Sequence, residues 1–149
     1  MFNKITNLYF SLLLTLMINV SYTQCEMPNN SISINGSDIW YNSTEIIGGF
    51  QFTVDGALPT GASGGDAAAA GFTVSTGGST VLGFSFTGGT IPAGCGTLTS
   101  LSLDGTASGL SNIVMSDPSG NSLNFSYSDS NSGVDIVCED ENACNFGEL

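Results

Sequence analysis

The chain has 149 residues with 13 acidic side chains, one basic side chain (Lys4) and no histidine, so its formal net charge is −12 at pH 7. A protein of this length holds one domain plus short extensions. So few cations cannot neutralise the phosphates of a nucleic acid, and an anionic membrane surface repels the chain, which excludes both as direct partners. The net charge instead favours solubility and the binding of divalent cations.

The first 23 residues have the pattern of a secretory signal peptide. Lys4 provides a positive start, residues 8–20 are apolar, and small residues precede a predicted cleavage after Thr23. The apolar run is shorter than the roughly 20 residues that a membrane-spanning helix needs. An uncleaved anchor and a lipid attached to Cys25 are the alternatives. Cleavage removes Lys4, so the mature chain has carboxylates but no cationic side chain.

Four cysteines follow the predicted cleavage site: Cys25, Cys95, Cys138 and Cys144. An even number of cysteines in a secreted chain indicates disulfides. Of the three possible pairings we favour a local Cys138–Cys144 bridge, which leaves Cys25 to pair with Cys95. Free thiols, or a partner cysteine elsewhere, remain open. A zinc site is disfavoured because the chain has neither histidine nor a Cys-x-x-Cys motif.

Residues 24–30 are polar and are expected to form a linker, after which apolar and polar residues alternate. In 47–54, Phe50, Phe52 and Val54 share one face, and in 80–87 the apolar face is predicted to be Leu82, Phe84 and Phe86. Period-two alternation is typical of half-buried strands. The predicted strands are 31–34, 38–41, 47–54, 71–75, 80–87, 96–103, 110–116 and 122–128. Seven or eight short strands predict an all-β sandwich or jelly roll.

The connections between the predicted strands have the composition of turns. Gly77-Gly78 suits a tight hairpin, and Asp104-Gly105 and Asp117–Asn121 are expected to be turns. Only residues 67–70 indicate a helix, and four residues are too few to stand alone. A disordered chain is the alternative, but the aromatic alternation is too regular for one.

Several of these segments resemble cohesin-like domains. Residues 45–54 (EIIGGFQFTV), 71–86, 94–103 and 110–123 are similar to successive strands of that family, over roughly residues 31–127. The resemblance implies a nine-stranded jelly-roll sandwich related to carbohydrate-binding modules. The chain differs where Val54-Asp55-Gly56 replaces a common Tyr-Asp pair, and in having Cys95.

Residues 129–149 form an acidic, cysteine-containing tail with little alternation. Within it, residues 138–146 resemble the Cys-containing ACN(Y/F) repeat of secreted marine bacterial surface proteins. Asp129, Asn131, Asp135 and Asp140 place oxygen ligands at spaced positions, a pattern that suits calcium. A solvated acidic linker is the alternative. No other cofactor is expected.

The composition provides poorly for catalysis. Without histidine, lysine or arginine in the mature chain, a serine nucleophile has no obvious base. The protein is therefore expected not to be an enzyme. The distant alternative is a glycoside hydrolase that uses two carboxylates. Its candidates are Asp38, Glu45, Asp55, Asp66, Asp104 and Asp117.

Trp40 and Tyr41 are candidate ligand-binding residues, because secreted β-sandwiches stack aromatic rings on sugars. A role in the core is the alternative for Trp40, and alternation puts it on the face opposite Ile39 and Tyr41. The sequence thus predicts a secreted, non-catalytic recognition or scaffolding module of an extracellular or cell-surface assembly. Its partner would be a protein, such as a dockerin-like one, or a carbohydrate. The alternative is a structural subunit that self-associates through an exposed edge strand.

Overall fold

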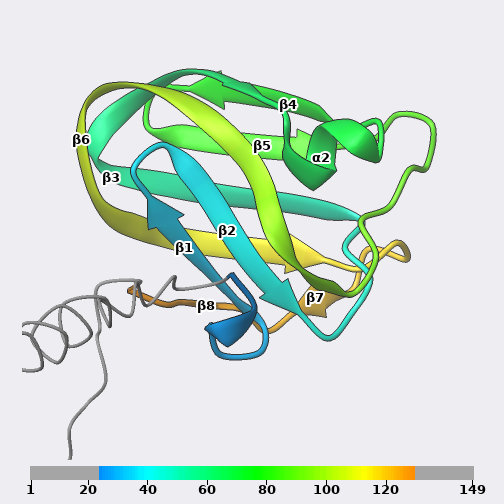
Figure 1. Cartoon of the computed structure of the whole chain (residues 1–149). Helices are drawn as coiled ribbons and strands as arrows, with labels where there is room; N and C mark the ends of the chain where they lie inside the picture. The colour runs from blue at the N-terminus through cyan, green and yellow to red at the C-terminus, as the bar shows by residue number, and fades with distance from the viewer. Residues whose placement is uncertain (1–23, 130–149) are drawn as a thin grey trace, which may run out of the picture.

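The computed structural model describes residues 24–129 and confirms an all-β protein (Figure 1). A short 3-10 helix η1 (Gln24–Glu26) and a one-turn helix α2 (Gly65–Ala69) accompany eight strands. The strands are β1 (Ser31–Asn35), β2 (Asp38–Ser43), β3 (Gly49–Ser63), β4 (Thr73–Gly77), β5 (Thr80–Phe84), β6 (Gly94–Ser116), β7 (Ser122–Leu123) and β8 (Ser126–Tyr127).

All the strands belong to one sheet, in the order β4-β5-β3-β6-β2-β1-β8, with β7 paired to β6. Neighbours are antiparallel except β1 and β8, which run parallel. The separate strands predicted at 96–103 and 110–116 are wrong: both belong to β6, which also pairs with β3 beyond the predicted end at residue 54. The two-sheet jelly roll is not confirmed, since hydrogen bonds link every strand into a single sheet.

The long strands β3 and β6 bend together instead of ending at turns. Their pairing shifts register between Asp55 and Ala57, where Gly56 has a φ of +83°, and Gly105 opposite has a φ of +106°. Such bulges bend and twist a strand pair without breaking it. The bend explains why Asp104-Gly105, expected to be a turn, lies inside β6. The sheet therefore curls until one half faces the other (Figure 1).

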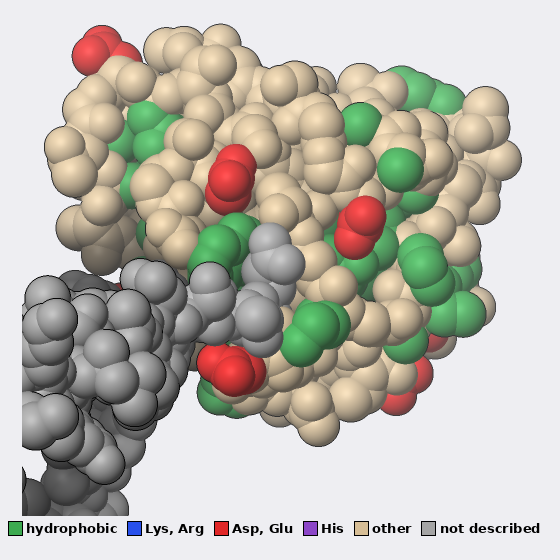
Figure 2. Space-filling model, in the orientation of Figure 1, with side chains coloured by type: hydrophobic (Ala, Val, Ile, Leu, Met, Phe, Trp, Pro, Cys, Tyr) green, Lys and Arg blue, Asp and Glu red, His purple; other side chains and the backbone are tan. Residues whose placement is uncertain are grey.

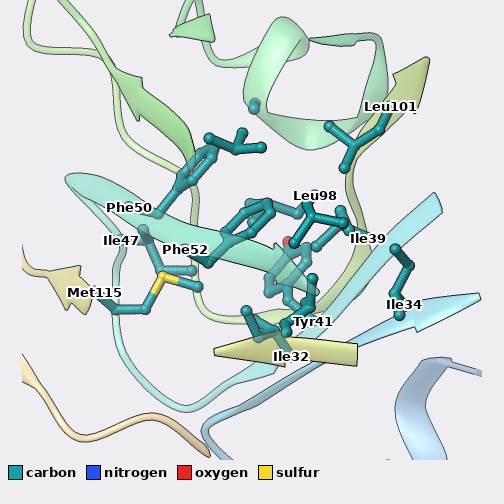
Figure 3. Packing of buried hydrophobic residues seen from close by; sticks show 14 of the residues in the cluster. Ile32, Ile34, Ile39, Tyr41, Ile47, Phe50, Phe52, Leu98, Leu101 and Met115 are labelled. Atoms are coloured by element: carbon teal, nitrogen blue, oxygen red, sulfur yellow. The ribbon is translucent and has the colours of Figure 1, made fainter. Parts of the chain in front are cut away.

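The hydrophobic core fills the space between the two halves of the curled sheet (Figure 3). Ile32 and Ile39 from β1 and β2 lie across from Phe52 of β3, and all three are fully buried. Phe50 stacks on Phe52 with ring centroids 6.0 Å apart and on Phe72 at 5.9 Å. The predicted inward face of β3 is confirmed. Burial of each such side chain contributes about 1.5–3 kcal/mol.

Residues 24–30 are bound to the sheet and do not form a free linker. A disulfide joins Cys25 to Cys95 of β6 across 70 residues, with the two Cα atoms 5.2 Å apart, which confirms that predicted pairing. The Asn42 side-chain amide also donates to the Met27 carbonyl at 2.7 Å. Because its sulfur is in the disulfide, Cys25 has no thiol for a lipid. Within residues 24–129 no helix is long and apolar enough to cross a membrane.

Candidate functional site

Trp40 and Tyr41 do not form one site, because they lie on opposite faces of β2. Tyr41 is 2 % exposed, and its hydroxyl donates to Asp66 Oδ2 at 2.7 Å. Burial of the phenol raises the pKa of Tyr41 strongly, and the hydrogen bond and charge of Asp66 raise it further. Tyr41 is therefore a core residue that cannot offer its ring to a ligand.

Trp40 lies half-buried on the other side of β2, in register with Ser33 of β1 and Thr97 of β6. The predicted separation of Trp40 from Ile39 and Tyr41 is confirmed. Ser33 is fully buried, and among the described residues its hydroxyl is the buried side-chain group without a hydrogen-bond partner. Trp40 is thus the member of the predicted pair that reaches the surface, as a single ring next to small polar side chains.

Three of the candidate carboxylates accept hydrogen bonds from residues that are far away in the sequence. Asp38 accepts from the Ser100 hydroxyl at 2.6 Å and Asp55 from the Ser111 hydroxyl at 2.8 Å, while Asp66 holds Tyr41 as described above. In each case the bond crosses between two elements of the fold. These carboxylates therefore have structural partners.

Asp117 closes the turn that the sequence predicts at 117–121. Its carboxylate accepts from the backbone amides of Ser119 and Asn121 and from the Asn121 side chain, each at 2.8 Å. These bonds, the Asn121 side chain first, lower the pKa of Asp117. Glu45 is exposed and follows the end of β2. The contacts of the Asp117 carboxylate are those of an aspartate that stabilises a turn.

Asp55 and Asp104 come together at the bend of β3 and β6, where both line an open hollow of about 420 Å³. The other residues that line it are Thr53, Val54, Gly56, Ala57, Leu58 and Ser79. Of the six candidate acids, this pair shares one hollow. Asp104 is exposed, and Asp55 already accepts from Ser111, so the hollow presents solvated acids to a ligand.

The predicted calcium loop falls largely outside the described residues. Asp129 is exposed at the end of the described chain, while Asn131, Asp135 and Asp140 lie beyond it, as do Cys138 and Cys144. Over residues 24–129, no three His, Cys, Asp or Glu side chains gather as metal ligands would. The calcium site and the Cys138–Cys144 bridge stay predictions.

A surface that the sequence did not predict lies on the outside of strands β5, β3 and β6. We call it the outer face. Its apolar members include Phe86, which is 79 % exposed, Val114 at 52 % and Leu82 at 41 %. The Phe84 ring meets Phe86 edge-on with centroids 4.6 Å apart. The outer face consists of Leu82, Phe84, Phe86 and Val114, together with the polar residues Gln51, Thr53, Thr80 and Asn112.

The outer face exists because β5 has the opposite orientation from the one predicted. Val81 and Gly83 point into the core, so Leu82 and Phe84 point outward and the predicted apolar face of 80–87 is wrong. The Phe50 ring occupies the space over Gly83, where an added Cβ would come within 2.1 Å of it. Glycine inside a strand often marks such a close approach. That glycine is the signal in the sequence that would have given the correct orientation.

The outer face carries no charged side chain, although the whole chain has a net charge of −12. On the side of the molecule shown in Figure 2, the acidic side chains of the described residues lie apart from one another. The nearest acid along β3 is Asp55, which follows Thr53 on the same side of the strand. The outer face can therefore stack apolar rings and exchange hydrogen bonds with a neutral, hydroxyl-rich ligand.

Comparison of the chain with protein-family models, with curated proteins and with solved structures gives no match. The cohesin-like resemblance and the resemblance of the tail to a surface-protein repeat therefore remain hypotheses.

Proposed function

We propose that this protein is a secreted, non-catalytic recognition module whose outer face binds a neutral carbohydrate in an extracellular or cell-surface assembly. The observation that carries the proposal is Phe86, 79 % exposed beside Phe84 on an uncharged sheet surface. Exposed apolar surface framed by polar side chains is typical of binding sites.

The chemistry of the outer face suits a neutral sugar better than a charged ligand. An aromatic ring packs against the apolar side of a pyranose, and amide and hydroxyl groups bind its hydroxyls. Phe86 would provide the ring, and Gln51 and Thr80 the hydrogen bonds. The net charge of −12 opposes a polyanion, and the outer face has no carboxylate to attract a polycation.

Two observations support secretion. The signal-peptide pattern precedes Thr23, and the Cys25–Cys95 disulfide is a bond that persists in oxidising compartments. The resemblance to cohesin-like domains, which are related to carbohydrate-binding modules, agrees with the proposed ligand.

The test is retardation of the native protein in gels that contain a neutral β-glucan, a xylan or, as the anionic counterpart, alginate. We expect retardation by a neutral polysaccharide. F86A should weaken binding about tenfold, equivalent to roughly 1.4 kcal/mol, and should change stability by less than about 0.5 kcal/mol because the side chain is exposed.

W40A is the matched control, since it removes the aromatic ring on the other side of the molecule. Binding lost in W40A but kept in F86A would contradict the outer face as the site. A protein retained from the secreted fraction through Phe86, with no polysaccharide bound, would replace the carbohydrate by a protein partner.

The second candidate function is a structural subunit that associates with copies of itself. It is favoured by β4, which forms one edge of the sheet and has a single neighbouring strand, β5, in the described structure.

A further inference from the structure

Strand β4 is a sheet edge without the features that normally prevent edge-to-edge pairing. Its sequence, TVSTG, contains neither charge nor proline, and its pairing with β5 runs from Thr73 to Gly77 without a bulge. Natural edge strands are usually protected by charges, prolines, bulges or a covering segment. Of these protections β4 has only its short length of five residues.

The hairpin that joins β4 to β5 determines which backbone groups face the open edge. Gly77 pairs with Thr80 across the two-residue turn Gly78-Ser79, in which Gly78 has a φ of +58°. The two residues that flank such a turn form two backbone hydrogen bonds with each other. From there, hydrogen-bonded and non-hydrogen-bonded residue pairs alternate along the two strands. Thr73, Ser75 and Gly77 therefore bond to β5, while Val74 and Thr76 direct their N–H and C=O groups outward.

We propose that β4 pairs antiparallel with β4 of a second copy of this chain, about a two-fold axis beside Ser75. In that register Val74 faces Thr76 of the second copy, and Thr76 faces Val74 of the second copy. Each pair exchanges two hydrogen bonds, so four bonds satisfy every outward-facing group of both edges. The edge is complementary to itself, as an isologous contact requires.

The side chains of β4 allow this contact. Thr73, Ser75 and Gly77 are small and exposed, and Val74 and Thr76 are half-buried on the core side. At the axis the two Ser75 residues would form a non-hydrogen-bonded pair with Cα atoms about 4.5 Å apart. β4 has no charged side chain, so the contact itself brings no carboxylates together, although the whole chain has a net charge of −12.

A strand of another protein would satisfy the same backbone groups. The second copy is favoured because it presents the same two outward-facing residues, Val74 and Thr76, with the same spacing, so that each backbone N–H and C=O group meets its partner. The inference rests on the second candidate function and is independent of carbohydrate binding by Phe86.

A charge-swap experiment at Ser75 tests this register. Sedimentation velocity of the native protein from about 10 to 500 μM should show a monomer–dimer equilibrium, a range suited to a weak interface. S75K and S75D each place like charges across the axis and should weaken dimerisation about fivefold or more, since directly opposed like charges destabilise a strand pair. An equimolar mixture of the two variants should form the heterodimer.

S102K is the matched control, because Ser102 is also exposed but lies on β6; it should dimerise like the native protein. A C138S/C144S background excludes intermolecular disulfides. A native protein that stays monomeric throughout, an S75K variant that dimerises normally, or a mixture that does not recover the heterodimer would each overturn the proposal. Because Ser75 pairs with Leu82, S75K also changes the border of the outer face, so F86A separates the two proposals: it should lose polysaccharide binding and dimerise like the native protein.

Discussion

The two ends of the sheet are built differently. At one end, which we call the β1 end, the first four residues of β1 are buried on both faces, and the two-residue strand β8 pairs along the outer edge of β1 as the last strand of the sheet. The nearby Cys25–Cys95 disulfide binds the preceding segment to β6. At the other end, β4 exposes alternate residues and has β5 as its one neighbour in the described structure.

This difference indicates how the small domain divides its tasks. The β1 end contributes stability, because its strand is enclosed and cross-linked. The β4 end contributes surface, because its backbone edge and the adjoining outer face meet solvent. Substitutions at the β1 end should therefore change mainly the free energy of unfolding, and substitutions at the β4 end mainly association.

Truncation of an aliphatic side chain to alanine at each end should have the most unequal effects. I32A removes a fully buried side chain and should lower the free energy of unfolding by about 2–5 kcal/mol. V74A removes part of a half-buried side chain and should cost roughly 1 kcal/mol or less. Urea denaturation followed by fluorescence measures both. Equal losses at the two ends would contradict the proposed division.

Loss of the disulfide should have the next largest effect. The C25A/C95A double variant opens a 70-residue loop and should lose about 2–4 kcal/mol of stability. Its dimerisation through β4 should stay close to native, because Cys95 lies in the part of β6 that pairs with β2, on the side away from β4. Reductant should lower the native unfolding midpoint and leave that of the double variant nearly unchanged. If reductant lowered the unfolding midpoint of the double variant as well, Cys138 and Cys144 would be the cysteines whose disulfide stabilises the protein.

The sequence predicted the features that depend on local pattern. Alternation in 47–54 identified Phe50, Phe52 and Val54 as core residues, and glycines at 77 and 78 identified the β4–β5 hairpin. The Cys25–Cys95 pairing followed from the even cysteine count once a local bridge was assigned to the tail. Each prediction needed only neighbouring residues or a count.

The features that were missed depend on contacts between segments far apart in the chain. The orientation of β5 is set by the Phe50 ring over Gly83, a contact between residues 33 positions apart that alternation within 80–87 cannot reveal. The continuity of β6 through Asp104-Gly105 depends on the matching bend of β3. Gly83 marks the first of these contacts in the sequence, but alternation alone predicted neither the outer face nor the curl of the sheet.

A smaller effect than loss of the disulfide is expected for a contact that links the two halves of the sheet. The Tyr41 hydroxyl on β2 donates at 2.7 Å to Asp66, in the helix that connects β3 to β4. Y41F removes this bond and leaves a carboxylate oxygen without its donor, so stability should fall by about 1–2 kcal/mol. Thermal unfolding at pH 7 measures the loss.

Burial of the Tyr41 phenol, together with its hydrogen bond to Asp66 and the charge of Asp66, should also make stability depend on alkaline pH. Because folding raises the pKa of Tyr41 above its unfolded value of about 10, the stabilisation is complete below pH 10 and is lost as the pH rises through the folded value. Native stability should therefore decline above about pH 10, and Y41F should reduce that decline. Y127F is the control: the pKa of Tyr127 is also raised, mainly by burial and further by the charges of Asp129 and Asp55. If Y127F removed more of the decline than Y41F, Tyr127 rather than the Tyr41–Asp66 contact would be the group that couples the fold to alkaline pH.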